Sequence, residues 1–186
     1  AQTLTSVGFD GVLFKGTLRD NLLMGNPHAS DEEARRVLVE VGAWDFVQAK
    51  GGLDMHVAEG ASNLSGGQRQ RICLARALLH DAEIYVFDEV TSSIDAQSEA
   101  AILRVIYDLA ERGKTVVMIS HRLSSVERAD AIYVMRDGRV VQHGPHTQLM
   151  EEGGVYRRMV EQQRELERFA QDKGVGDVSS HDEAPG

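Results

Sequence analysis

Cysteine is almost absent from this chain of 186 residues, in which Cys73 is the single thiol. One cysteine can form no intramolecular disulfide and no cysteine metal cluster, and this usage fits a reducing cytosol. Long apolar runs are also missing, since no stretch approaches the roughly 18 residues of a membrane-spanning helix. Residues 1–5 have neither the basic nor the apolar region of a signal peptide. The composition therefore predicts a soluble globular domain.

Positive charge is in deficit, because 20 lysines and arginines stand against 29 aspartates and glutamates, for a formal net charge of -9. An acidic chain repels phosphate backbones, so we expect no nucleic-acid partner. Part of the acidity lies in residues 173–186, where Asp177, Asp182 and Glu183 stand among glycine, serine and proline. That composition predicts a disordered acidic tail.

A starting methionine is missing as well, and Ala1 leads almost directly into the strand-like residues 4–7. The length corresponds to one domain and suffices for a proper core. Together these features lead us to expect a fragment of a longer protein.

Helices dominate the expected structure of the first 80 residues. Thr17 is a suitable N-cap for a short helix through Leu23, and Ser30 with Glu33 has the spacing of a capping box. The strongest predicted helix opens at residues 65–67, where one serine precedes two glycines. Apolar residues then recur at helical spacing along one face of it. They are Ile72, Leu74, Ala75, Leu78 and Leu79.

Strands and helices alternate in the second half of the chain. Continuous apolar runs at 84–87 and 115–119 predict strands that are buried on both faces of a parallel sheet. Residues 98–110 between them have helical periodicity. Asp137-Gly138 predicts a two-residue hairpin turn between strands at 131–135 and 139–143. The terminal residues 155–169 are polar, charge-laced and helical, so an α/β domain is expected.

The start of the strongest helix is suited to bind an anion. Free N–H groups and the positive end of the helix dipole favour negative charge there, and glycines let a ligand approach the backbone. Ser65 would add a hydroxyl and Gln68 an amide, next to Gly66 and Gly67. The alternative is a helix that is merely capped after a glycine turn, and for an isolated Ser-Gly-Gly this is the better interpretation.

Two carboxylates follow the apolar run 84–87, where a strand of a parallel sheet would end. Ligands of open α/β sheets bind at that edge. Asp88 could hold Mg²⁺ through water, and Glu89 could orient or deprotonate a water that attacks a phosphate. The alternative is that Asp88 only caps or forms a salt bridge.

His121 directly follows the second predicted strand and is expected at the same sheet edge as Glu89. A histidine there can contact a phosphate oxygen and the attacking water. Taken by itself, a single histidine is more often structural. The other histidines are expected on the surface, and they are His28, His56, His80, His143, His146 and His181.

The order and spacing of these segments resemble the ABC ATPase family over roughly residues 4–160. Leu64–Gln68 matches the family's signature motif letter for letter. Asp88 corresponds to the Walker B aspartate and Glu89 to the catalytic glutamate. Ser92–Asp95 resembles the D-loop, and His121 the switch histidine. The ends resemble exporter-type members, and the stretches concerned are Phe14–Asn21 and Gly144–Tyr156.

The resemblance implies an α/β fold, namely a partial P-loop NTPase domain with a parallel core sheet and an α-helical subdomain that carries the signature motif. The expected organisation is a strand and Q-loop at 1–14, the helical subdomain at 15–80, part of the catalytic core at 81–154, a C-terminal helix at 155–172 and the acidic tail at 173–186.

The family also implies a mechanism and partners. Two such domains close head-to-tail around two ATP molecules with Mg²⁺. Residues 65–68 would then contact the nucleotide bound by the partner domain, while Asp88, Glu89 and His121 act on the nucleotide of their own domain. Asp95 is expected to contact nucleotide as well. A transmembrane domain, on the same or a partner chain, would be driven from the cytoplasmic side of the membrane. The sequence holds no transmembrane domain, so the transported substrate stays open. The choice between homodimer and heterodimer also stays open.

The P-loop of the family is missing from this sequence. Its pattern requires a glycine five residues before Gly113, but Asp108 stands there, so Gly113-Lys114-Thr115 is a decoy. Its context is also reversed, with a helix leading into a strand. We therefore expect little or no ATP binding by the chain alone. Loss of the first core strand and the P-loop helix should also expose apolar sheet surface.

The Q-loop is unusual, because alignment places Phe9 where the family has glutamine; a shifted alignment is the alternative. Phenylalanine cannot coordinate Mg²⁺, which favours a second hypothesis, a regulatory and weakly hydrolysing half of a heterodimer. A third hypothesis is a non-transport ABC ATPase. Such enzymes carry long coiled coils, however, and the terminal helix has no sustained heptads.

Overall fold

The computed structural model describes residues 4–8, 11–92 and 94–175, with side chains as far as residue 169. The chain divides into two compact units, residues 1–120 and 121–186, which are described separately. Phe9, which the alignment places at the position of the Q-loop glutamine, lies outside the described residues. Among the described helices, none is both long enough and apolar enough to cross a membrane.

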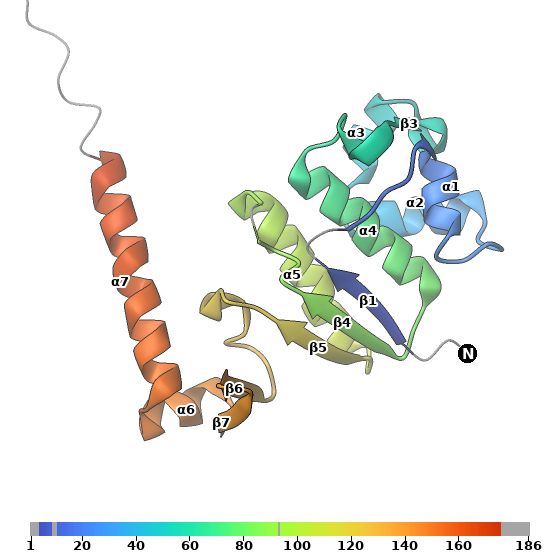
Figure 1. The fold of residues 1–186 in the computed structure, drawn as a ribbon. Helices are drawn as coiled ribbons and strands as arrows, with labels where there is room; N and C mark the ends of the chain where they lie inside the picture. The colour runs from blue at the N-terminus through green and yellow to red at the C-terminus, as the bar shows by residue number, and fades with distance from the viewer. Residues whose placement is uncertain (1–3, 9–10, 93, 176–186) are drawn as a thin grey trace, which may run out of the picture. The chain divides into compact units, whose positions relative to one another are not determined.

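A parallel sheet forms the centre of the first unit (Figure 1). Its strand order is β1-β4-β5, and the last residues Gly8, Asp88 and Ile119 stand in register at the carboxyl edge. The crossover from β4 to β5 is the long helix α5, as a parallel pair requires. The bounds are Leu4–Gly8 for β1, Ile84–Asp88 for β4, Ala96–Glu111 for α5 and Thr115–Ile119 for β5.

The two faces of this sheet differ in burial. Tyr85 and Phe87 alternate inward from β4 and are buried, with their rings stacked 6.2 Å apart between centroids. On the opposite face Leu4, Val117 and Ile119 are 55%, 47% and 51% exposed. The prediction that 115–119 is buried on both faces is therefore wrong. The described residues leave this face open, so the apolar run of β5 alternates between the core and solvent.

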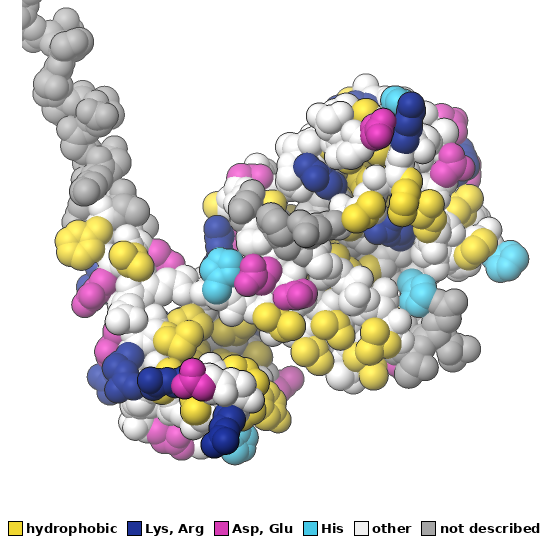
Figure 2. Space-filling model, viewed as in Figure 1, with side chains coloured by type: hydrophobic (Ala, Val, Ile, Leu, Met, Phe, Trp, Pro, Cys, Tyr) yellow, Lys and Arg dark blue, Asp and Glu magenta, His cyan; other side chains and the backbone are white. Residues whose placement is uncertain are grey.

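Hydrophobic side chains follow the strands on the side of the first unit that Figure 2 shows. This agrees with the expected exposure of apolar sheet surface. Such a surface is costly in water, because each buried Å² of apolar area contributes about 25 cal/mol.

Helices make up most of the rest of the first unit. Three of them begin with the reciprocal side-chain bonds of a capping box, made by Thr17 with Asp20, Ser30 with Glu33, and Ser65 with Gln68. These local bonds satisfy N–H groups that a helix start leaves without carbonyl partners. The helices are α1 (Leu18–Leu23), α2 (Asp31–Glu40), α3 (Trp44–Ala49) and α4 (Gly66–His80), with the short strands β2 (Gly16–Thr17) and β3 (His56–Val57) and the 3-10 turns η1 (Gly52–Asp54) and η2 (Glu59–Ala61).

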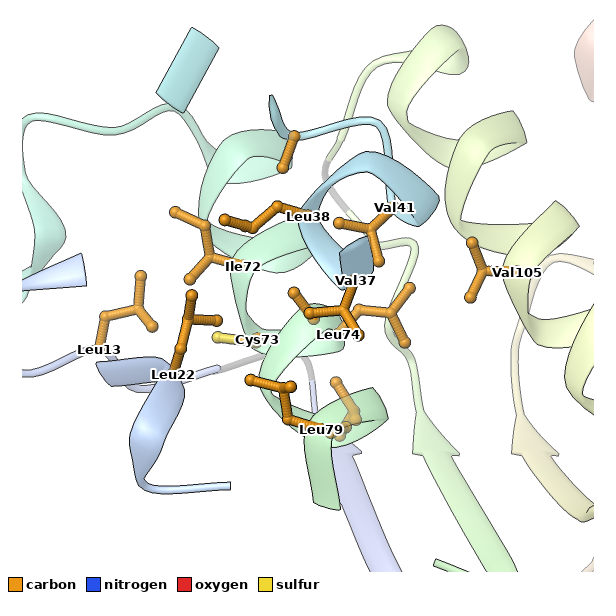
Figure 3. Packing of buried hydrophobic residues seen from close by; sticks show 14 of the residues in the cluster. Leu13, Leu22, Val37, Leu38, Val41, Ile72, Cys73, Leu74, Leu79 and Val105 are labelled. Atoms are coloured by element: carbon orange, nitrogen blue, oxygen red, sulfur yellow. The ribbon is translucent and has the colours of Figure 1, made fainter. Parts of the chain in front are cut away.

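One hydrophobic cluster joins these helices to the sheet (Figure 3). Ile72 and Leu74 of α4 and Leu38 of α2 are fully buried in it. Because α4 packs against α1, α2, α5 and β1, it is the central helix of the unit. The position of the predicted signature motif, at the start of α4, is therefore set by the core.

The second unit contains the predicted hairpin and the terminal helices. Asp137 and Gly138 both have positive φ, 50° and 72°, as expected for the turn type that their sequence favours. Tyr156 and Val160 of the terminal helix are buried. The elements are η3 (Leu123–Ser125), β6 (Ile132–Arg136), β7 (Arg139–Gly144), α6 (His146–Glu152) and α7 (Val155–Val175). Because α7 continues to Val175, the tail does not begin at 173 as predicted; residues 176–186 lie outside the description.

Candidate functional site

The start of α4 shows how the predicted anion site is built. The Ser65 hydroxyl accepts from the Gln68 backbone N–H, and Gln68 Oε1 accepts from the Ser65 N–H, both at 3.2 Å. The helix is therefore capped, as the alternative interpretation held, but the cap does not use all the N–H groups at the helix start. Capping uses the third N–H of the helix, whereas those of Gly66 and Gly67 have no carbonyl one turn earlier to bind. Both belong to the predicted motif, and Ser65 and Gly66 are exposed.

Gly67 lacks a side chain for a reason that the sequence did not reveal. A Cβ atom there would lie 2.4 Å from Ser98 Oγ, 2.8 Å from Ser98 Cβ and 3.2 Å from Asp95 Oδ2. The protein's own chain, rather than a ligand alone, therefore requires this glycine. Ser98 was missed by sequence reasoning, although its spacing from Asp95 is that of a helix cap.

Asp95 begins α5 and faces the start of α4. Its carboxylate accepts from the Ser98 backbone N–H at 2.8 Å. Hydrogen bonds from the Ser98 side chain, and then from its backbone, lower the pKa of Asp95 below the ordinary value of 3.8, and the charge of Arg71 acts in the same direction. The structure thus brings Asp95 and Gly67 together.

The carboxyl edge of the sheet carries Asp88 and Glu89, and both are exposed. Glu89 has a φ of 50°, a left-handed conformation that costs a non-glycine residue about 1 kcal/mol or more. Its N–H donates to the Ile119 carbonyl at 2.9 Å, and its own carbonyl accepts from Ser92 N at 2.9 Å and Ser92 Oγ at 2.8 Å. The backbone on both sides therefore holds Glu89 in this turn.

These residues fit a magnesium nucleotide in part. Mg²⁺ keeps most of its waters and takes one or two carboxylates, which adjacent exposed carboxylates at a sheet edge can supply. Within the described ranges, no group of three or more His, Cys, Asp or Glu side chains is placed to hold a metal. Asp88 therefore suits a water-rich site completed by phosphate oxygens, not a closed protein cage.

His121 is the first residue of the second unit and is exposed. Since the two units are described separately, its predicted place beside Glu89 stays a prediction.

The decoy interpretation of Gly113-Lys114-Thr115 agrees with the local structure. Gly113, with a φ of 83°, follows α5, and Thr115 begins β5, so a helix leads into a strand. Lys114 Nζ lies 3.0 Å from Asp81 and 3.8 Å from Glu83. It stands at the amino end of β5, whereas Asp88 stands at the carboxyl edge. No phosphate at that edge is within reach of this lysine by sheet geometry.

The parallel sheet, its acidic carboxyl edge and the capped glycine helix together define an α/β nucleotide-binding domain. The profile of the ABC transporter family matches residues 4–92. An uncharacterized ABC transporter ATP-binding protein of Haemophilus influenzae is 46% identical over 168 residues, 90% of this chain and 30% of that protein. The ATP-dependent lipid A-core flippase of Thiobacillus denitrificans is 43% identical over 152 residues, 81% of this chain and 26% of the flippase.

A solved structure agrees with these relatives. The structure of a bacterial Atm1-family ABC exporter with ATP bound matches with a TM-score of 0.80 and 34% identity, over 87% of this chain and 28% of that one. The chain belongs to the ATP-binding domains of the ABC transporter family, and the predicted fold class is confirmed. It spans about 30% or less of the length of these relatives.

Proposed function

We propose that this chain is part of the motor of an ABC exporter, in which ATP hydrolysis on the cytoplasmic side drives a transmembrane domain. The supporting observation is the turn at Glu89, a left-handed glutamate held by the backbone directly after Asp88. Strained conformations of this kind gather at functional sites. A lipid A-core flippase among the relatives and an ATP-bound exporter among the solved structures support the transport role.

The residues divide into two groups in this proposal. On the nucleotide bound by its own complete domain, Asp88 would hold Mg²⁺, and Glu89 would orient the attacking water and accept its proton. His121 contacts the γ-phosphate. As the water oxygen bonds to the γ-phosphorus, the bond to the bridging oxygen breaks and ADP leaves. When bound, Mg²⁺ neutralises charge that develops on the phosphates.

Residues 65–68 act on the nucleotide of a second, head-to-tail domain. The N–H groups at the start of α4 donate to its γ-phosphate, and Ser65 and Gln68 can leave their mutual bonds to do the same. Asp95 lies close to Gly67 and shares this interface. Catalysis would rest on positioning and charge neutralisation.

Binding is tested first, by titration calorimetry with Mg-ATP. This chain is compared with a longer version that also carries the family's phosphate-binding loop. We expect only the longer version to bind. Micromolar binding by the chain alone would show that other groups hold the phosphates and would reopen the interpretation of Lys114.

Hydrolysis is tested by Glu89→Gln in the longer version, which keeps the shape of the side chain but removes the base. Loss of a general base lowers turnover by about 10²-fold or more. The matched control is Glu32→Gln, the same change at an exposed position of α2. Unchanged turnover would exclude Glu89 as the base and favour the regulatory hypothesis.

A further inference from the structure

A buried amide ties the helix of the predicted signature motif to the end of β1. Gln70, in the second turn of α4, is only 4% exposed, and its Nε2 donates to the Gly8 carbonyl at 3.0 Å. Gly8 is the last residue of β1 and the register partner of Asp88. This single bond therefore connects the start of α4 with the sheet edge that bears Asp88 and Glu89.

The same stripe of α4 contacts the chain that follows β1. Residues 70, 73 and 76 recur at a spacing that places them on one helix face. Arg76 Nη1 donates to the Val12 carbonyl at 3.0 Å. A Cβ at Gly11 would lie 2.6 Å from Cys73 Sγ, so the Gly11 backbone is packed directly onto the helix. Gln70 is the most buried polar group of this stripe and the one that reaches the strand itself.

We propose that Gln70 is a positioning residue of the ATPase, which sets the place of the signature motif relative to Asp88 and Glu89. The inference rests on the proposed function. In a head-to-tail dimer the two motifs serve different ATP molecules, so a rigid link between them makes one site sense the geometry of the other. Removing the donor leaves the Gly8 carbonyl without this partner, and the helix loses its buried hydrogen bond to the strand.

The link is tested in this chain by amide hydrogen exchange of Gln70→Met, which keeps the length of the side chain but removes the donor. The loss of one such bond corresponds to about a tenfold fall in protection, expected at residues 11–14. In the same experiment, protection at residues 85–87 of β4 should change by less than about twofold, because a local opening leaves the core strands closed. The matched control is Gln48→Met, the same change at an exposed position of α3.

An unchanged protection at residues 11–14, or an equal loss at 85–87, would overturn the proposal. Gln70→Glu tests whether the hydrogen bond itself carries the effect. A protonated carboxyl can donate to Gly8 and an ionised one cannot, so protection relative to the unsubstituted chain should recover at low pH. If Gln70→Met does not fold, Gln70→Glu compared at low and neutral pH carries the same test, and equal protection of residues 11–14 at both pH values would count against the link.

The catalytic consequence is tested in the longer, ATP-binding version. Gln70→Met should lower kcat by roughly tenfold or more and leave KM for ATP nearly unchanged, because misplacement affects the reacting geometry. A raised KM with unchanged kcat, or the same loss in Gln48→Met, would contradict this. If the unsubstituted longer version does not hydrolyse ATP, the proposed function fails, while the exchange experiment still decides whether Gln70 provides the link.

Discussion

At the scale of single residues, Gly67 and Asp95 show that the start of α4 and the start of α5 pack against each other. Gly67 lies so close to Ser98 that the start of α4 and the start of α5 form a single packed corner. Asp95 caps α5 in the same corner through the Ser98 N–H. A change at either residue should therefore affect folding as well as any contact with nucleotide.

Gly67→Ala is expected to destabilise the chain by about 1–3 kcal/mol. Alanine favours a helix by about 1 kcal/mol over glycine, but the clash outweighs this gain. Ser98 Oγ can rotate away, whereas Ser98 Cβ, 2.8 Å from the added atom, cannot move without the backbone. Urea unfolding followed by circular dichroism measures the change. Gly8→Ala is the control, since its added Cβ meets nothing within 4 Å; equal effects of both variants would refute the argument.

Asp95 should make stability depend on pH in the acid range. Its folded pKa lies below the ordinary 3.8, so the unfolded chain takes up the proton first as pH falls. The stabilisation is complete above about pH 4 and is lost as pH drops through the folded pKa. We expect the free energy of unfolding to fall less steeply below pH 4 in Asp95→Asn than in the unsubstituted chain. Urea titrations across this range measure it, with Asp45→Asn, an exposed carboxylate of α3, as the control.

At the scale of elements, helix starts were predictable and strand burial was not. The caps at Thr17 and Ser30 are local patterns of four residues, and the structure forms both. The strand at 115–119 was also predicted, but the prediction of its two-sided burial was wrong, because burial depends on what packs on each face. The same limit applies to residues 113–115. Their sequence resembles the end of a phosphate-binding loop, but a helix leads into a strand there, which is the reverse of the order that such a loop requires.

Lys114→Met should leave the affinity of the longer version for Mg-ATP unchanged, because Lys114 pairs with Asp81 at the amino end of β5. Titration calorimetry of both proteins tests this expectation. Asp81→Asn removes the same ion pair from its other side and should behave alike. A tenfold loss of affinity in Lys114→Met alone, about 1.4 kcal/mol, would assign the lysine to the nucleotide.

At the scale of the molecule, the open face of the sheet is the outstanding feature. Val117 and Ile119 are about half exposed on β5, and Leu4 is more so on β1. Exposed apolar surface of this kind, next to an edge strand, favours association. Figure 2 shows hydrophobic side chains gathered over these strands.

The chain should therefore self-associate in solution, and the double variant Val117→Lys with Ile119→Lys should shift it towards the monomer. Charge on an exposed sheet face opposes both stacking and edge pairing. Sedimentation velocity over a range of concentrations measures the distribution. The control is Val39→Lys, a similarly exposed apolar residue of α2 away from the sheet. A monomeric unsubstituted chain at every concentration would contradict the prediction.

Sequence reasoning reached the family, the α/β class and the carboxylates at the sheet edge, because these depend on short motifs in a given order. Leu64–Gln68 and Asp88 with Glu89 could be recognised without any contact map. Ser98 and Gln70 could not be singled out in this way. Their roles depend on partners far away in sequence, Gly67 and Gly8, that only packing brings near.

The sequence alone determined where helices begin, where the buried strand ends and which residues carry charge at that end, since hydrophobic period, caps and turns act over a few residues. Only the tertiary structure decided that Gly67 makes room for Ser98, that Glu89 adopts a left-handed turn and that one face of β5 is open. These depend on which surfaces meet, and burial is a property of the whole fold and not of any short segment of the chain.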